Sequence, residues 1–195
     1  MPYDPPPELA ALSLAEIADL VAARRLPPVA QWSPAQSGDS EMRIMADGRW
    51  FHQGGEIRRP AMIRAFSTLL SRDPDGQHWL VTPHEKLSIA VEDAAFIAVD
   101  VKREGEAADG ALAFRLNTDE FVIAGPDHPL VARGTVEAPA LYLGVRHGCE
   151  ARLNRSTWAQ LAELALSEAE NANTVGISVA SGGIRFPLLP GGSAA

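Results

Sequence analysis

Apolar residues recur with a helical period in three segments of the chain. The first segment follows Ser13 and Glu16, which form a capping-box pattern, and ends at Pro27. The second begins at Pro60, a residue favoured at the first helical position, and the third begins near Asn154. The apolar stripes are Leu14, Ile17, Leu20 and Val21; Met62, Ile63, Phe66, Leu69 and Leu70; and Trp158, Leu161, Leu164 and Ala165. Three helices are therefore predicted.

Other segments alternate apolar and polar residues or form short apolar runs, which predicts strands. These segments are 50–52, 79–81, 87–91, 96–101, 112–116, 121–123, 141–145, 175–179 and 184–186. Asp73-Pro74-Asp75-Gly76 has the residue preferences of a type I turn. Segment 29–45 is predicted as an irregular connection that packs over a sheet, and the charged segment 102–109 as a solvated hairpin loop.

A weak internal repeat places a glycine, a glutamate and an arginine before a helix at two points. The two copies are Gly55-Glu56-Ile57-Arg58 and Gly148-Cys149-Glu150-Ala151-Arg152. The alternative is that any two strand-helix units look this similar. We predict an α+β fold of two similar small lobes, each a curved antiparallel β-sheet covered by one α-helix, plus an N-terminal helical arm. The expected boundaries are 1–45 for the arm, 46–94 and 95–187 for the lobes, and 188–195 for a flexible tail.

Composition narrows the class of protein. The chain has 195 residues, of which 46% are apolar and 22% charged, as in ordinary soluble domains. Its net charge of −8 disfavours nucleic-acid binding, which needs a basic surface. The single cysteine, Cys149, can form no internal disulfide and is expected to be a structural thiol. We find neither a signal peptide nor a membrane span, and we expect a cytoplasmic protein without metal or cofactor.

Arginines at two predicted helix starts are the first candidate for a ligand site. Arg58 and Arg59 stand before one helix, and Arg152 and Arg155 stand at the start of another. Free backbone N–H groups and the positive end of the helix dipole favour anions there, and arginine can bind a phosphate or carboxylate bidentately. The alternative is that Glu56 and Glu150, two residues before Arg58 and Arg152, neutralise them in ordinary salt bridges.

Residues at strand ends are the second candidate. Thr82 and Glu85 lie in a loop between two strands, and Trp50 and His52 lie on another predicted strand. Glu85 can act as a general base if burial raises its pKa, with His52 or His84 as its partner. The alternative is that Thr82 shapes the turn and Glu85 pairs with an arginine. The histidines and carboxylates of this region lack the spacing of a metal site, and we expect no metal.

Many short matches distributed over 27–186 resemble the bacterial family called domain of unknown function 1285. They are Pro27-Pro28-Val29, Trp32, Pro34, Asp47-Gly48-Arg49-Trp50, His52, Gly54, Ile57-Arg58, Thr82-Pro83-His84-Glu85-Lys86, Val91-Glu92-Asp93, Val145-Arg146-His147-Gly148, Ala151 and Asn154-Arg155. The resemblance implies a two-lobed α+β protein with repeated motifs, no assigned activity and a role in signal transduction. It brings no catalytic residues. His84 departs from the family, which has an apolar residue at this place.

The function expected from these observations is that of a non-enzymatic protein that binds a small anionic ligand or a peptide between its lobes. The missing catalytic motifs, the arginines and the family resemblance favour it. One alternative is a hydrolase that uses Glu85 with a histidine and, in one version, a metal. Another is a module that pairs with a protein partner through an exposed strand edge.

Overall fold

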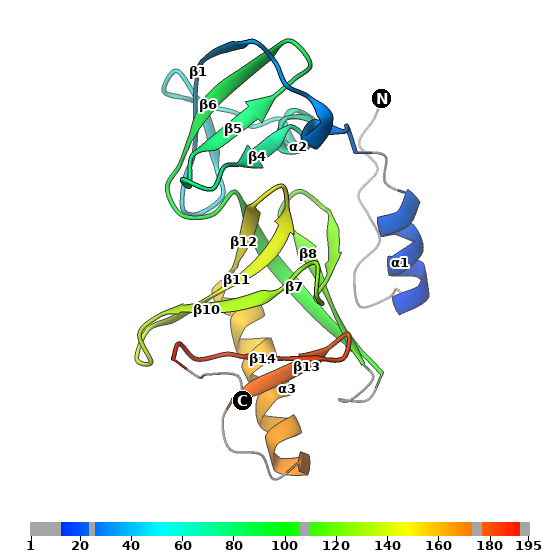
Figure 1. Ribbon diagram of the computed structural model, residues 1–195. Helices are drawn as coiled ribbons and strands as arrows, with labels where there is room; N and C mark the ends of the chain where they lie inside the picture. The colour runs from blue at the N-terminus through cyan, green and yellow to red at the C-terminus, as the bar shows by residue number, and fades with distance from the viewer. Residues whose placement is uncertain (1–12, 24–25, 106–109, 173–176, 192–195) are drawn as a thin grey trace.

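The computed structural model describes residues 13–23, 26–105, 110–172 and 177–191, and Figure 1 shows two lobes stacked one above the other. The first lobe contains β1 (Gln36–Ile44), β2 (Trp50–His52), β3 (Gly55–Glu56), α2 (Pro60–Ser67), β4 (Leu70–Arg72), β5 (His78–Val81) and β6 (Glu85–Val91). The second contains β7 (Phe96–Glu104), β8 (Ala111–Leu116), β9 (Phe121–Ile123), β10 (Leu130–Gly134), β11 (Pro139–Arg146), β12 (Cys149–Leu153) and α3 (Arg155–Ala172). Helix α1 (Leu14–Ala23) precedes the lobes, and a hairpin of β13 (Ser178–Ser181) and β14 (Ile184–Pro187) follows them.

The two lobes are built on one strand plan. The first sheet has the order β3-β2-β1-β6-β5-β4 and the second the order β10-β11-β12-β7-β8-β9. In each, two antiparallel three-stranded units are joined by a parallel pair, β1 with β6 and β12 with β7, which are the first and last of the six strands. Two similar sheets in an α+β fold are thus confirmed. The expectation of purely antiparallel sheets is wrong, because alternation shows which face a residue occupies but not which strand lies beside it.

The helices break the symmetry of the strands. Helix α2 connects the two halves of the first sheet, whereas α3 follows the last strand of the second. The sequence repeat therefore aligned β3, the third strand of one lobe, with β12, the sixth strand of the other. Segments 55–58 and 148–152 are not equivalent in the fold, although each is followed by a helix.

Helices α2 and α3 form where the apolar spacing predicted them. Pro60 is the first residue of α2, and Phe66 stacks on the buried Trp50 with 6.4 Å between ring centroids. Met62, by contrast, is 39% exposed and does not belong to the buried stripe. Leu69 and Leu70, predicted in the same stripe, lie beyond the end of α2, and Leu70 is the first residue of β4. In α3, the N–H of Thr157 donates to Oδ1 of Asn154 (2.8 Å), which caps the helix.

Segment 29–45 is the main misassignment. It holds a short 3₁₀ turn, Val29–Gln31, and then β1, a central strand of the first sheet. The first residues of β1 are polar and exposed, and only Met42 and Ile44 in the strand are buried, so the strand carries almost no alternation. Strands β10 and β12 also lie outside the predicted strands.

Two smaller expectations also change. In segment 102–109, β7 continues to Glu104, and Arg103 turns inward to form an ion pair with Glu168 of α3; residues 106–109 lie outside the described part. Leu188, expected in a frayed tail, is fully buried, and its N–H donates to the carbonyl of Ile177 (2.9 Å). Of the N-terminal arm, residues 1–12 lie outside the described residues.

One hydrophobic cluster runs through both lobes and fixes one against the other. It includes Trp50 and Leu70 of the first lobe and Phe96 and Cys149 of the second. The N–H of Arg72 donates to the carbonyl of His147 across the junction (2.8 Å).

Candidate functional site

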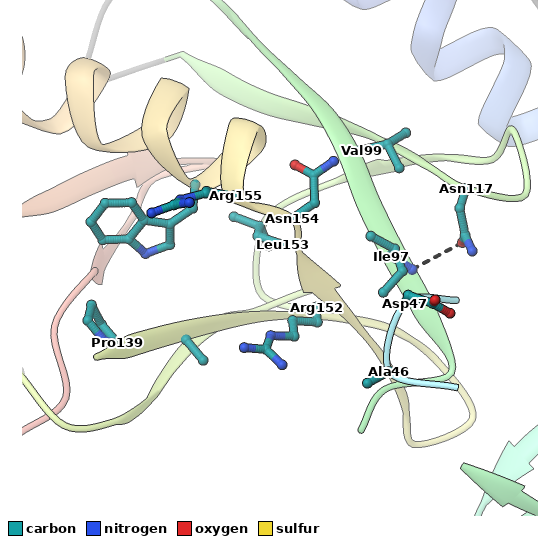
Figure 2. Close-up of a pocket in the computed structure, with 12 residues that line it drawn as sticks. Ala46, Asp47, Ile97, Val99, Asn117, Pro139, Arg152, Leu153, Asn154 and Arg155 are labelled. Carbon is teal, nitrogen blue, oxygen red and sulfur yellow. Dashed lines mark hydrogen bonds between the residues drawn. The ribbon is translucent and has the colours of Figure 1, made fainter. Parts of the chain in front are cut away.

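An open pocket of about 580 Å³ lies at the junction of the lobes. The turn between β1 and β2 supplies one wall, and the second lobe supplies the rest from β7, the β8–β9 turn, β11, β12 and the start of α3 (Figure 2). The lining residues are Ala46, Asp47, Ile97, Val99, Asn117, Pro139, Ala140, Arg152, Leu153, Asn154, Arg155 and Trp158. Apolar side chains thus form much of the lining, with two arginines, one aspartate and two asparagines among them. That composition is typical of small-molecule sites, where a few polar groups orient the ligand.

Arg155 is the pocket's exposed cation. It is the first residue of α3, and no ion pair joins it to another described residue. Figure 2 shows Arg152 and Arg155 on one side of the pocket and Asp47 and Asn117 on the other. The guanidinium stands where the free N–H groups of the first helical turn and the helix dipole also favour an anion. The charge at this end of the pocket is therefore available to a ligand.

Arg152 is held by a carboxylate from the linker between the lobes. Its Nη1 lies 2.5 Å from Oδ2 of Asp93, and the side chain is 43% exposed. The hydroxyl of Tyr142 donates to the other carboxylate oxygen of Asp93 (2.7 Å). The hydrogen bond with Asp93 raises the pKa of Arg152, and burial followed by the Asp93 bond raises the pKa of Tyr142. Asp93 thus orients Arg152 and partly neutralises it.

A second ion-pair group lies next to Arg152 on the same sheet. Both guanidinium nitrogens of Arg133 contact Glu150, at 2.8 and 2.5 Å, and the Arg133 guanidinium lies 4.4 Å from the Tyr142 ring centroid. Arg72 of the first lobe approaches Glu150 at 3.6 Å. The expectation that Glu150 pairs with Arg152 is wrong, because Glu150 is occupied by arginines of β10 and β4.

The β1–β2 turn reaches the pocket because a glycine lets it approach the second lobe closely. Gly48 has a φ of 83°, and a Cβ there would lie 2.8 Å from Nδ2 of Asn117 and 2.9 Å from Cγ1 of Ile97. Asn117 Oδ1 in turn accepts the N–H of Ile97 (3.0 Å; Figure 2). Asp47, in the same turn, pairs with Arg49 at 2.7 Å. This turn is therefore positioned as a fixed wall.

The indole of Trp158 carries an unpaired donor beside the pocket. Its Nε1 is buried and has no hydrogen-bond partner among the described residues. Trp158 itself lines the pocket and is only partly buried. A buried N–H usually finds an acceptor, so this donor is an unsatisfied polar group next to the pocket.

A buried ion pair supports the junction behind the pocket. Arg146 of β11 pairs with Glu120, and its Nη2 also donates to the carbonyl of Ser67 at the end of α2 (2.8 Å). The guanidinium lies 4.9 Å from the ring centroid of Phe96, and burial lowers the pKa of Arg146 to about 10. At neutral pH Arg146 stays charged, so it bonds both lobes as a cation.

The other two arginines do not share this pocket. Arg58 is 82% exposed and pairs with Glu56 at 3.1 Å, as the salt-bridge alternative expects. Arg59 is the exposed N-cap residue of α2 and makes no side-chain capping bond. Of the four arginines proposed from the sequence, the structure brings together Arg152 and Arg155.

The remaining predicted site residues are dispersed. Trp50 is 1% exposed and belongs to the core. Thr82 shapes the β5–β6 turn, because its Oγ1 accepts the N–H of Glu85 (3.1 Å). Glu85 pairs with Gln36 and His52 with Met42 along β1. These partners, Gln36 and Met42, are six residues apart on β1. At about 3.3 Å per residue, Glu85 and His52 therefore lie about 20 Å apart, which is too far for a shared acid-base site.

Within the described part of the chain, the remaining chemistry-bearing groups form no metal cluster. Cys149 is buried, as expected, and burial raises the pKa of its thiol to about 12. Among the described residues, no three His, Cys, Asp or Glu side chains are grouped to hold a metal ion. No helix in the described part of the chain has the length and apolar character needed to cross a membrane.

Sequence reasoning missed Asp47, Asn117, Trp158 and the Asp93–Tyr142 pair as parts of one site. In the sequence, Asp47 stands out only among the residues of the family resemblance, and Trp158 only as part of a predicted apolar stripe. Asn117 is the one with a usable signal, because an asparagine at a strand end commonly bonds the backbone. Asp47 reaches the pocket only through the contact between the lobes, and Asp93 comes from the linker, whereas Trp158 and Tyr142 belong to the second lobe itself.

Comparison with known proteins places this architecture in a family. The model described as "Domain of unknown function (DUF1285), N-terminal domain" matches residues 27–94, and "Protein of unknown function (DUF1285), C-terminal domain" matches residues 95–188. No curated protein matches the chain.

Two solved structures have the same fold. A DUF1285 family protein from Silicibacter pomeroyi DSS-3 is 36% identical, with a TM-score of 0.77, over 92% of this chain and 96% of that one. A second DUF1285 family protein, from Shewanella baltica OS155, is 22% identical, with a TM-score of 0.51, over 63% of this chain and 90% of that one. At this identity the match shows only that the folds are similar. The resemblance seen in the sequence is confirmed, and the chain belongs to the DUF1285 family.

Proposed function

We propose that this protein is a non-enzymatic binding protein that takes a small anionic ligand in the pocket at the lobe junction. Its occupancy would serve signal transduction. The observation that carries the proposal is Arg155, an exposed guanidinium in the first turn of α3 that lines the pocket and has no ion-pair partner among the described residues. Arg152 lies in the same pocket, oriented by Asp93.

The size of the pocket favours a small molecule over a peptide. A volume of about 580 Å³ falls within the range of about 300–1,000 Å³ that is usual for small-molecule sites. Apolar residues of β7 and α3, including Val99 and Trp158, line it beside the arginines. The ligand expected here carries a phosphate or carboxylate for Arg155, an acceptor for the Trp158 N–H and an apolar body.

A thermal-shift screen with inorganic phosphate, sugar phosphates, carboxylic acids, nucleotides and cyclic dinucleotides tests the proposal. A ligand at 100 times its Kd, bound to the folded state alone, adds about 2.7 kcal/mol of stability, a shift such a screen detects. Each hit is then titrated calorimetrically against the wild type and the Arg155→Ala and Arg58→Ala variants.

Arg58→Ala is the matched control, because Arg58 also stands at a helix start but outside the pocket. We expect affinity to fall at least tenfold in Arg155→Ala and to stay unchanged in Arg58→Ala. Equal affinity in wild type and Arg155→Ala would contradict the proposal, and so would the lack of any anion that binds.

A further inference from the structure

Helix α1 packs on the outer face of the second sheet, away from the main core. Ile17 is fully buried, while Ala15, Glu16, Ala18 and Asp19 around it are exposed. Ile17 contacts Ala113 of β8 and the partly buried Phe121 and Ile123 of β9. These four apolar residues, which we call the outer cluster, form a hydrophobic cluster separate from the core that joins the lobes. Figure 1 shows α1 beside the second lobe.

The register of the strands shows that the outer cluster and α3 occupy opposite faces. Ala113 lies opposite Ile123 on one side and opposite Lys102 on the other, so all three share a face. Arg103, the next residue of β7, points to the other face and pairs with Glu168 of α3. Helix α1 therefore covers a face that α3 leaves open.

The start of α1 is stabilised by its own residues. The N–H of Glu16 donates to Oγ of Ser13 (3.3 Å), and the N–H of Ser13 donates to Oε2 of Glu16 (2.8 Å). This reciprocal capping box needs no contact with the lobes. The two family models match 27–94 and 95–188. Helix α1 thus lies outside the two segments that the family models match.

Charge complements the apolar contact. Exposed Glu16 and Asp19 make α1 acidic, while Lys102 and Arg115 occupy the same face of the sheet as the outer cluster. Both cations also have partners in the lobe, Glu104 at 3.8 Å from Lys102 and Asp119 at 3.9 Å from Arg115. The hydrogen bonds from Ser13 lower the pKa of Glu16, and the Lys102 charge lowers it further. Lys102 therefore interacts electrostatically with the docked helix.

We propose that Ala113, Phe121 and Ile123 form a binding site for an acidic amphipathic helix, and that α1 is its intramolecular ligand. Docking follows the helix-in-groove mode, with Ile17 as the apolar anchor and Glu16 within the electrostatic influence of Lys102. Because α1 belongs to the same chain, its effective concentration at the site is high. The bound α1 therefore prevents a free helix from binding there. Removing the anchor opens the site without dismantling the family fold. This site is independent of the anion pocket.

A labelled peptide with the sequence of residues 8–26 tests this against the full-length protein. Fluorescence anisotropy measures its binding to the wild type, to Ile17→Ala and to Ile17→Ala/Phe121→Ala, with the Ile17→Ala peptide as matched control. We expect the peptide to bind Ile17→Ala at least tenfold more tightly than the wild type. Affinity should be lost in the double variant and with the control peptide. Equal binding to wild type and Ile17→Ala, or no binding to Ile17→Ala, would overturn the proposal.

Hydrogen exchange in the wild-type full-length protein provides a test that needs no variant. We expect the amides of α1 to exchange as a separate unit, faster than those of β7 and β8. Protection of α1 equal to that of β8 would make it an integral part of the fold and overturn the proposal. A concentration-dependent dimer, measured by sedimentation and abolished in Ile17→Ala, would assign the site to α1 of a second copy instead and overturn the intramolecular assignment.

Discussion

The two helix starts that carry arginines look alike in the sequence and differ in the fold. At α2, Arg58 pairs with its neighbour Glu56 and faces solvent. At α3, Arg152 and Arg155 line a pocket, and the partner of Arg152 is Asp93 of the linker. The local residues are similar, and the surroundings decide which pair can hold a ligand. The start of α3 lines a pocket because the β1–β2 turn of the other lobe lies against it.

The difference follows from where each helix is inserted in a common strand plan. Helix α2 joins the two halves of its sheet, and α3 extends from the last strand of its own. The start of α3 therefore lies near the linker and near the β1–β2 turn, whose Gly48 fits closely against Ile97 and Asn117. If this account is right, disrupting the junction should affect the protein more than disrupting the exposed start of α2.

Loss of Arg146 should have the largest effect. Arg146→Ala removes the arginine that pairs with Glu120, whose side chain is only 4% exposed. The substitution also removes the hydrogen bond from Arg146 to the Ser67 carbonyl. Breaking a buried pair from one side costs about 3–5 kcal/mol. Urea unfolding should show a loss of that size. Arg64→Ala, which removes a more exposed junction pair with Asp119, should cost about 1 kcal/mol or less. Similar losses of unfolding free energy in both variants would contradict the claim that the buried Arg146 pair stabilises the junction more than the Arg64 pair does.

Gly148→Ala should have the next largest effect. Gly148 has a φ of 76°, and a Cβ there would lie 2.6 Å from the carbonyl oxygen of Arg72 in the other lobe. Gly54 has a similar φ of 81° with open space around it, so Gly54→Ala measures the backbone strain alone, about 1–2 kcal/mol. In thermal or urea unfolding, Gly148→Ala should lose clearly more. Equal losses would show that the lobes can separate slightly without penalty.

Acid should weaken the junction through His78. This side chain is buried, and burial followed by the charge of Arg72 lowers its pKa. Because the unfolded histidine binds a proton more readily than the folded one, the resulting stability is present above about pH 6.5. It is lost as pH falls through the lower folded pKa. As the pH is lowered from 7 to 5, the free energy of unfolding should fall less steeply in His78→Gln than in the wild type. A slope in His78→Gln equal to that of the wild type would exclude this role.

The smallest effect is expected at the start of α2. Arg58→Ala removes an exposed ion pair with Glu56, and such pairs contribute between about 0 and 1 kcal/mol. Thermal unfolding should differ from wild type by no more than that amount. A larger loss would mean that the start of α2 has a structural role beyond its visible contacts.

The sequence was sufficient for features that depend on neighbours in the chain. Pro60 and Asn154 marked the helix starts, and the capping box of Ser13 and Glu16 is present as predicted. It was insufficient for β1, whose first residues are polar because that end of the strand is exposed. The parallel pairing of β1 with β6 is equally invisible, since it joins residues about 50 positions apart.

The candidate site was predictable only in part for the same reason. Arg152 and Arg155 could be proposed because they stand at a helix start. Asp47 and Asp93 could not be assigned to the same site, since both come from outside the second sheet: Asp47 lines the pocket from the first lobe, and Asp93 pairs with Arg152 from the linker. Trp50 was proposed for its position on a strand, and the fold buries it in the core.

The most direct test of the central claim is an NMR titration of the full-length protein with inorganic phosphate and with the strongest hit of the ligand screen. The claim predicts shifts in the indole N–H signal of Trp158 and in the backbone amides of Asn117, Asn154 and Arg155, with those of Arg58 and Arg59 unchanged. Comparable shifts at Arg58 and Arg59, or a Trp158 indole signal unmoved at saturation, would contradict it.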